Sequence, residues 1–422
     1  MPSPIGPVLR NAAYRRLLTA QVVSLLGTGL ATVALGLLAH DLAGRRAGAV
    51  LGTVFGIKMV AYVVLAPVAT ALVARLPRRS VMVTADVLRA VVALALPFAG
   101  QVWQIYVLVF VLQAASAVHT PTFQSALPDV VTDEHEYTQA LSFSRLADDL
   151  EMVLSPMLAA ALLLVVSTHA LFVGTGLGFA ASAVLIMSVV VPRAATPAAA
   201  DEGTPFEELP LGARVRHGAL LMARTPGLRP ALALNLAVAA AGAFVLVQTV
   251  VIARDTFGQS NDVVALLLAV NGLGSMTTAL ALPAVLRRRS ERGVMLGGAV
   301  LLTVATFAVP LALGIQAPTA GLVTVGLVWL AVGAGWAAAE VPIARLIVRH
   351  VPAGERHSVF AAQFSLSHAC WLVTYPLAGW LGAAGLRGAA LVLAVVAAAA
   401  TGAATALWPR KAAVPTTPGG GR

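Results

Sequence analysis

The chain has 422 residues, of which 59% are hydrophobic and only 11% are charged, and its mean hydropathy is +0.88. Soluble proteins carry about 25% charged residues, so this composition excludes a soluble globular protein and indicates a surface that faces lipid. The formal net charge is +10. The basic residues stand in short clusters between apolar runs, which favours membrane orientation over nucleic-acid binding.

Continuous apolar runs of about twenty residues predict transmembrane helices rather than the alternating strands of a β-barrel. We therefore predict an all-α polytopic membrane protein with twelve spans. The predicted spans cover residues 17–40, 49–74, 81–98, 102–118, 138–166, 170–191, 228–252, 263–286, 294–314, 319–338, 359–383 and 386–408.

The longest connection, 192–227, separates six spans from six. This predicts an N-terminal six-helix bundle (1–191), a cytoplasmic linker (192–227), a C-terminal six-helix bundle (228–408) and a disordered cytoplasmic tail (409–422). The halves also repeat, since Arg79-Ser80-Val81-Met82 is echoed by Arg292-Gly293-Val294-Met295. Several such matches in register indicate a duplicated six-helix unit.

The arginines mark one side of the membrane in this span order. Those at 10, 15, 16, 75, 78, 79, 193, 214, 216, 224, 287–289, 292, 349 and 356 share one side, against Arg45, Arg46, Arg254 and Arg387 on the other. By the positive-inside rule, both termini are cytoplasmic. We expect a multi-pass, monomeric protein of the cell (inner) membrane.

Twelve spans in a six-plus-six repeat, a long central loop and basic loops after spans 2 and 8 resemble the major facilitator superfamily. Segments 11–17 (NAAYRRL) and 121–129 (PTFQSALPD) are similar to its drug- and siderophore-exporter branch, typified by enterobactin exporters. The resemblance implies two pseudo-symmetric bundles that alternate access to a site at the midplane.

The family's signature loop after span 2 contains basic residues that match Arg75, Arg78 and Arg79. Its acid and second glycine are replaced here by Ala74 and Pro77. The resemblance therefore implies that Asp86 and Arg89, at the start of span 3, take over the charge relay that gates the cytoplasmic side. The antiporter signature of span 5 reads SPMLAA at 155–160, which keeps small residues for close helix packing but lacks the glycines.

Span 5 carries four charged residues, Arg145, Asp148, Asp149 and Glu151. Spacings of three and four residues bring their side chains onto neighbouring parts of one helix face, and Asp148 is about 15 Å from the start of the span. Each charge costs about 2.5 to 3.5 kcal/mol at the centre of a membrane helix. Two readings stay open, a proton relay and a neutralised structural ion pair.

Further polar residues lie in other spans, and we predict that they line the substrate and proton pathway. They are Gln21, Lys58, Asn271, Gln363 and His368. In the family fold, span 5 neighbours span 8 and span 2 neighbours span 11, which implies that Asn271 is near the acids and His368 near Lys58. His119 and Glu340 occupy equivalent repeat positions at the cytoplasmic ends of spans 4 and 10, where they form either a gate or contacts with lipid head groups.

No Walker lysine motif, His-Glu-x-x-His or Gly-x-Ser-x-Gly is present in the sequence, so we predict no enzyme activity, no cofactor and no metal site. The predicted function is proton-coupled efflux of a small amphipathic molecule, with protons, that molecule and the bilayer as partners, and no nucleic acid. The alternatives are a metal-cation exporter, or a non-transporting membrane sensor or assembly factor on the same fold.

Overall fold

The computed structural model describes residues 7–65, 76–131, 133–189, 211–352 and 356–409, and inside some helices it describes the backbone without every side chain. This part of the chain is all-helical, as predicted. The long helices are α1 (Ala12–Ala43), α2 (Ala47–Val60), α4 (Arg78–Ala95), α5 (Val102–Val130), α6 (Glu134–Leu163), α7 (Thr168–Met187), α9 (Arg229–Val251), α10 (Asn261–Val285), α11 (Glu291–Ala312), α12 (Pro318–Glu340), α14 (Arg356–Ala384) and α15 (Leu386–Leu407).

Each predicted span overlaps one of these helices. Nine helical segments of the described residues are long and apolar enough to cross a membrane, and the first of them, Ala12–Val63, contains both α1 and α2. Apolar side chains such as Val87, Val91 and Leu177 are exposed on the outside of the bundle, which suits contact with lipid. The chain is therefore a multi-pass membrane protein.

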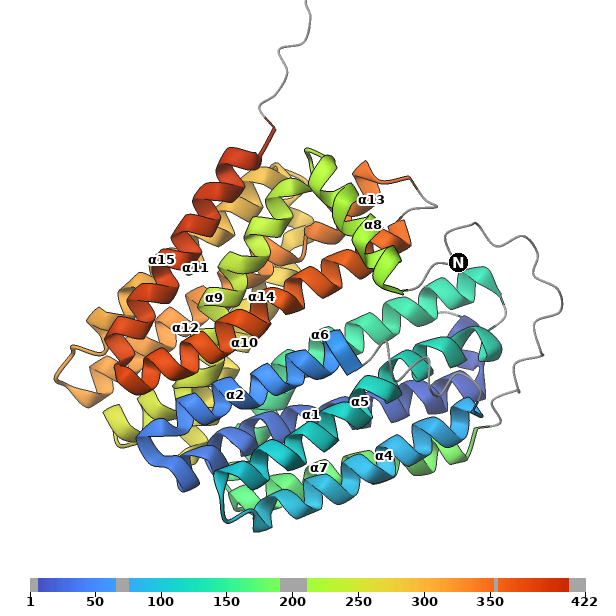
Figure 1. Cartoon of the computed structure of the whole chain (residues 1–422), viewed down its shortest axis with the longest axis horizontal. Helices are drawn as coiled ribbons and strands as arrows, with labels where there is room; N and C mark the ends of the chain where they lie inside the picture. The colour runs from blue at the N-terminus through green and yellow to red at the C-terminus, as the bar shows by residue number, and fades with distance from the viewer. Residues whose placement is uncertain (1–6, 66–75, 132, 190–210, 353–355, 410–422) are drawn as a thin grey trace, which may run out of the picture.

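α5 extends well past the end predicted from its apolar run, to Val130 instead of residue 118. α12 ends at Glu340, close to the predicted 338, and is followed by the separate short helix α13 (Ile343–His350). Backbone hydrogen bonding does not depend on lipid, so a helix continues where its sequence becomes polar. α13 and the other short helix, α8 (Leu211–Arg224), lie at the same end of the molecule (Figure 1). We call this the basic end, because Arg78, Arg79, Arg289 and Arg292 lie there at the starts of α4 and α11.

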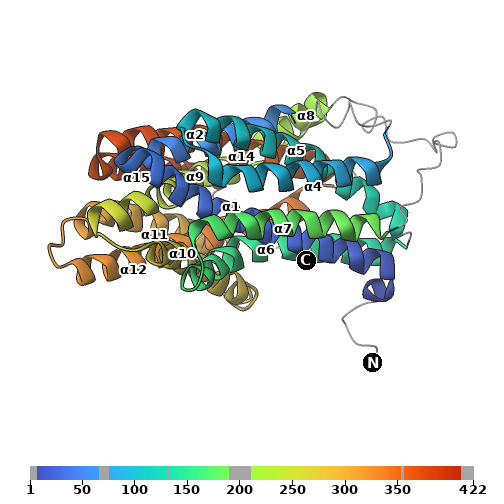
Figure 2. The same cartoon turned by 90° about the horizontal axis from the view of Figure 1, so that it is seen from below.

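The long helices run side by side along the long axis of the molecule (Figure 2) and pack as two groups. α1, α2, α4, α5, α6 and α7 form an N-terminal bundle, and α9, α10, α11, α12, α14 and α15 form a C-terminal bundle. The two bundles meet mainly where α2 packs on α14 and α6 packs on α10 (Figure 1). These are the neighbours that the resemblance implies for spans 2 and 11 and for spans 5 and 8.

The two segments that resemble siderophore exporters contact each other at the basic end. The Asn11 side chain caps α1 by accepting from the Ala13 and Tyr14 amides, and its own amide donates to the Val130 carbonyl at 3.0 Å. The Tyr14 hydroxyl donates to the Ala140 carbonyl of α6 at 3.2 Å. Segment 11–17 therefore fixes α1 against the end of α5 and the start of α6.

Glycines bring α2 and α14 into close contact at the end opposite the basic end. A Cβ atom at Gly52 would lie 2.5 Å from the Tyr375 carbonyl oxygen, and one at Gly379 would lie 2.4 Å from the Gly48 carbonyl oxygen. We call Gly48, Gly52 and Gly56 of α2 with Gly379 and Gly382 of α14 the glycine seam. Only residues without a side chain permit this backbone approach, so the seam holds the two bundles together at this end.

Candidate functional site

The two faces of α4 differ in polarity and in exposure. Its outer face is a stripe of exposed apolar residues, Val87, Val91 and Leu94, whereas its inner face carries the buried charges of Asp86 and Arg89. In a membrane the apolar stripe faces lipid, so the charged side chains are turned into the N-terminal bundle. The spacing of three residues between Asp86 and Arg89 puts both on that inner face.

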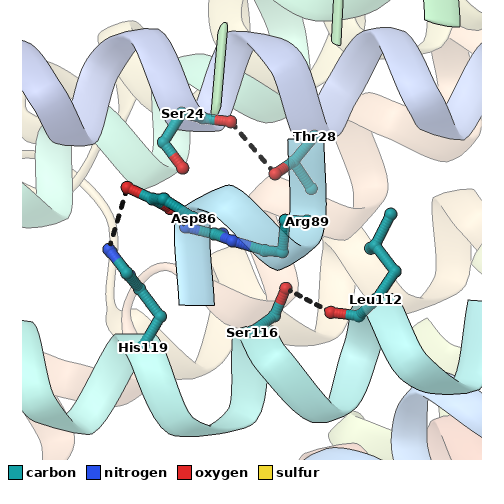
Figure 3. A network of polar contacts seen from close by, with 7 residues as sticks. All are labelled: Ser24, Thr28, Asp86, Arg89, Leu112, Ser116 and His119. Atoms are coloured by element: carbon teal, nitrogen blue, oxygen red, sulfur yellow. Dashed lines mark hydrogen bonds and ion pairs between the residues drawn. The ribbon is translucent and has the colours of Figure 1, made fainter. Parts of the chain in front are cut away.

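Asp86, Arg89 and His119 form a buried charge cluster between α4 and α5 (Figure 3). Asp86 is fully buried, and its carboxylate accepts a hydrogen bond from the Arg89 guanidinium. Its second oxygen, Oδ2, lies 3.5 Å from His119 Nε2. That separation exceeds an ordinary hydrogen bond but allows an ion pair once the imidazole is protonated. The three residues were each predicted as gating residues, and the structure brings them together.

α1 and α7 complete the surroundings of this charge cluster. The Arg89 guanidinium lies 4.4 Å from the centre of the Phe179 ring, a cation–π contact. Ser182, one turn further along α7, is fully buried beside Asp86, and Ser24 of α1 faces the cluster from the other side (Figure 3). Sequence reasoning missed Phe179 and Ser182, because neither residue type signals a charged neighbour on another helix.

Two of the predicted gating arginines join the start of α4 to the ends of α5 and α7 within the N-terminal bundle. Arg78 forms an ion pair with Asp129 near the end of α5, and Arg79 donates to the Met187 carbonyl at the end of α7. Arg75 lies outside the described residues. Asp129 was not predicted as a site residue, although it ends the 121–129 segment that carries the family resemblance.

Of the four charged residues of span 5, the structure describes the side chain of Glu151 alone; those of Arg145, Asp148 and Asp149 lie outside the described part, although their backbone is in α6. Glu151 faces α1, since its Oε1 would lie 2.9 Å from a Cβ at Gly29. Ser155, which begins the worn antiporter signature, is fully buried against the same glycine. α1 and α6 thus pack closely beside Glu151.

Lys58 and His368 are brought close together, through one tyrosine. The Lys58 ammonium lies 5.9 Å from the Tyr62 ring centre, and the Tyr62 and His368 rings meet edge-on at 6.0 Å. His368 also stacks on Phe364 and its Nδ1 lies 2.8 Å from the Phe364 carbonyl. This contact crosses between the two bundles, from α2 and the π-helical turn after it (Ala61–Leu65) to α14.

The predicted pathway amides bind within single bundles. Asn271 donates to the Trp329 carbonyl of α12 at 2.9 Å, so its amide contacts a helix of its own bundle. Gln363 exchanges two hydrogen bonds with Asn235 of α9, at 2.8 and 3.1 Å. The Gln21 amide lies 3.4 Å from the Ser144 carbonyl of α6. A polar side chain in an apolar span can therefore join two helices by a hydrogen bond instead of lining a transport pathway.

Four aromatic side chains link the bundles toward Glu340. Ring centres are 4.9 Å apart between Phe55 of α2 and Tyr375, 4.9 Å between Tyr375 and Trp371, and 5.0 Å between Trp371 and Trp336. The Trp336 indole donates to the Glu340 carboxylate. We call Phe55, Tyr375, Trp371 and Trp336 the aromatic row. Sequence reasoning missed it, because its members come from three helices.

Two polar contacts join the bundles at the end opposite the basic end. His40, near the end of α1, lies 2.9 Å from Asp255, which follows α9. Asn261, at the start of α10, donates to the Thr168 hydroxyl at the start of α7 at 3.0 Å. Together with the glycine seam, these contacts close this end of the interface between the bundles. No group of three metal-ligating side chains occurs among the described residues.

The sequence matches a known family and several known proteins. The family model "Major Facilitator Superfamily" matches residues 17–373. The MFS-type transporter YfiS of Bacillus subtilis (strain 168) is 28% identical over 366 residues, 84% of each chain. Macrolide efflux protein A of Enterococcus faecalis is 26% identical over 137 residues, which are 31% of this chain and 42% of that protein.

Solved structures share the fold. A bacterial homologue of the human lysosomal transporter Spinster, in an inward-facing and unoccupied conformation, matches with a TM-score of 0.72 at 13% identity, over 95% of this chain and 98% of that one. A D-xylose–proton symporter matches with a TM-score of 0.67 at 15% identity, over 94% and 97%. At such identities the likeness concerns the fold alone.

Proposed function

The chain belongs to the major facilitator superfamily, and on that premise we propose that it exports small amphipathic molecules in exchange for protons, by alternating access. The moving units are the two bundles, 1–191 and 228–408, joined by the linker 192–227. The basic end faces the cytoplasm of the cell that bears the protein in its membrane, in keeping with the positive-inside rule.

The proposed substrate class rests on the aromatic row and on the Glu340 carboxylate at its end. Phe55 belongs to one bundle and Trp336 to the other, so the row spans the interface that alternating access must open. Aromatic faces bind apolar rings and attract cations, and Glu340 beside Trp336 adds a negative charge. An amphipathic organic amine fits this combination. The similarity to a macrolide efflux protein supports export of an organic molecule.

The buried charge cluster supports a proton-carrying role for His119. When the imidazole is neutral, Asp86 and Arg89 balance each other; when it is protonated, Asp86 lies close enough to pair with it. Protonation therefore changes the charge inside the N-terminal bundle without leaving an ion unpaired. Asp148 and Asp149 stay candidate proton carriers on the sequence argument, as do Glu151 and Lys58 of the same bundle.

A siderophore stays a candidate substrate on the resemblance of segments 11–17 and 121–129 to siderophore exporters. Asn11 and Tyr14 of the first segment contact the end of α5 and α6 at the basic end. A substrate panel should therefore contain macrolides and siderophores alike.

The test is transport in proteoliposomes with an imposed pH gradient. We expect the purified protein to accumulate a basic macrolide against its gradient only while the proton gradient lasts. His119→Gln should keep downhill movement but lose accumulation, whereas His169→Gln, an exposed histidine at the start of α7, should behave as the wild type. Accumulation by His119→Gln equal to wild type would refute the role of His119; no gradient-dependent movement of any panel compound would refute the proposed function.

A further inference from the structure

A pocket of about 410 Å³ opens at the basic end of the C-terminal bundle. It lies between the loop after α10, the start of α11, α13 and the end of α15. Its lining residues are Gly227, Leu286, Arg289, Ser290, Glu291, Arg292, Arg345, Leu346, Arg349, His350, Trp408 and Pro409. None of these takes part in the buried charge cluster or the aromatic row, so the transport mechanism leaves the pocket unexplained.

The lining carries a strong excess of positive charge. Four arginines face one carboxylate, Glu291, whose two oxygens lie 3.5 Å from Arg345 Nε and 3.3 Å from Arg349 Nη1. The arginine side chains remain 58% and 71% exposed despite this pairing. α11 also begins in the pocket, and the N-terminus of a helix attracts anions. The pocket is therefore suited to an anionic group, and planar guanidinium groups favour phosphate.

Besides Ser290 and His350, the rest of the lining is apolar, and its tryptophan is typical of the membrane boundary. Leu286 and Leu346 form part of the wall, and Trp408 follows the last turn of α15. Tryptophan is enriched at the boundary between hydrocarbon and head groups, and basic pockets between helix ends on the cytoplasmic side bind the head groups of anionic lipids. A free phosphate would use the arginines but not the apolar wall.

We infer that this pocket binds the phosphodiester head group of an anionic phospholipid from the leaflet at the basic end, with Arg289 and Arg292 as its principal ligands. Arg345 and Arg349 pair with Glu291, which leaves Arg289 of the loop and Arg292 of the first turn of α11 to meet the phosphate. The lipid would fasten the loop after α10 to α13 and thereby stiffen the C-terminal bundle.

The test compares two charge-matched pairs of arginines between the end of α10 and the first turn of α11. Arg289→Gln/Arg292→Gln removes two lining arginines, and Arg287→Gln/Arg288→Gln removes two exposed ones outside the pocket. Retention of phosphatidylglycerol and of phosphatidylcholine is measured by native mass spectrometry of the purified proteins. Glycerol phosphate is added in a separate arm, and Arg289→Lys/Arg292→Lys serves as a second variant that keeps the charge if the glutamine pair misfolds.

The wild type should retain phosphatidylglycerol over phosphatidylcholine, and the pocket pair of glutamines should lower that retention about tenfold or more. The control pair should retain it as the wild type does, and the lysine pair should retain an intermediate amount. Equal losses in both glutamine pairs would overturn the proposal in favour of general surface attraction. Complete displacement by glycerol phosphate would overturn it in favour of a free-phosphate site.

Discussion

Asp86 is fully buried in an apolar bundle, yet it is held by a guanidinium on its own helix and faces an imidazole from the next. Taking such charges out of water is costly unless each finds a partner. The family resemblance predicts Asp86 and Arg89 as gating residues, and the repeat position of His119 predicts it as either a gating residue or a contact to lipid head groups. The sequence does not predict that they meet, since residues 86 and 119 belong to different helices whose rotation about their axes is set by packing.

Removing one partner of this pair should cost much stability. Asp86→Asn leaves the Arg89 guanidinium buried without its counter-charge, and we expect a loss of about 3 kcal/mol or more. Asp86→Asn/Arg89→Gln should recover part of that loss. Asp129→Asn breaks the half-exposed pair with Arg78 and should cost about 1 kcal/mol or less. Unfolding measured in detergent checks this, and equal losses for Asp86→Asn and Asp129→Asn would contradict the account.

Glu340 shows the limit of reasoning from residue type. Its repeat position matches that of His119, which predicts either a symmetric gate or symmetric contacts with lipid head groups, but the two side chains have different surroundings. His119 faces Asp86 inside the N-terminal bundle, whereas Glu340 accepts from Trp336 at the end of the aromatic row. Asn271 and Gln363 show the same limit, because their amides serve helix packing within the C-terminal bundle.

At the scale of helices, the pairing of α2 with α14 depends on glycine. Gly48, Gly52 and Gly56 recur at every fourth residue, a pattern typical of close helix contacts. The sequence therefore contains the signal for a close contact but not the identity of the partner helix. The end of α5 could not be predicted either, because hydropathy reports the part of a helix within lipid and not its hydrogen-bonded length.

A larger side chain in the glycine seam should hold it open. In Gly52→Leu, the new side chain would clash with the Tyr375 carbonyl oxygen, so the ends of α2 and α14 should separate. A cysteine at Thr53 in a Cys370→Ala background then reports accessibility to a membrane-impermeant maleimide. We expect several-fold faster labelling in Gly52→Leu and no change in Gly402→Leu, where a side chain meets open space. Unchanged labelling in Gly52→Leu would show that the seam does not close this end.

At the scale of the whole molecule, the two bundles have an ion pair at equivalent positions, but the positive and negative residues are exchanged between them. In the N-terminal bundle, Arg78 at the start of α4 pairs with Asp129 near the end of α5. In the C-terminal bundle, Glu291 at the start of α11 pairs with Arg345 and Arg349 of α13. The duplicated scaffold was predictable from the repeated sequence motifs. The reversal of charge was not, because each ion pair needs a partner whose position only the fold provides.

We propose that the two bundles rock against each other, so that the end closed by the glycine seam opens during the transport cycle. The distance between spin labels at Arg45 and Thr256, one on each bundle at that end, tests it by double electron–electron resonance in a Cys370→Ala background. We expect a short and a long distance whose proportions change with pH, while labels at Arg45 and Val166, both in the N-terminal bundle, keep one distance. A single short distance at every pH for the first pair would show that this end does not open.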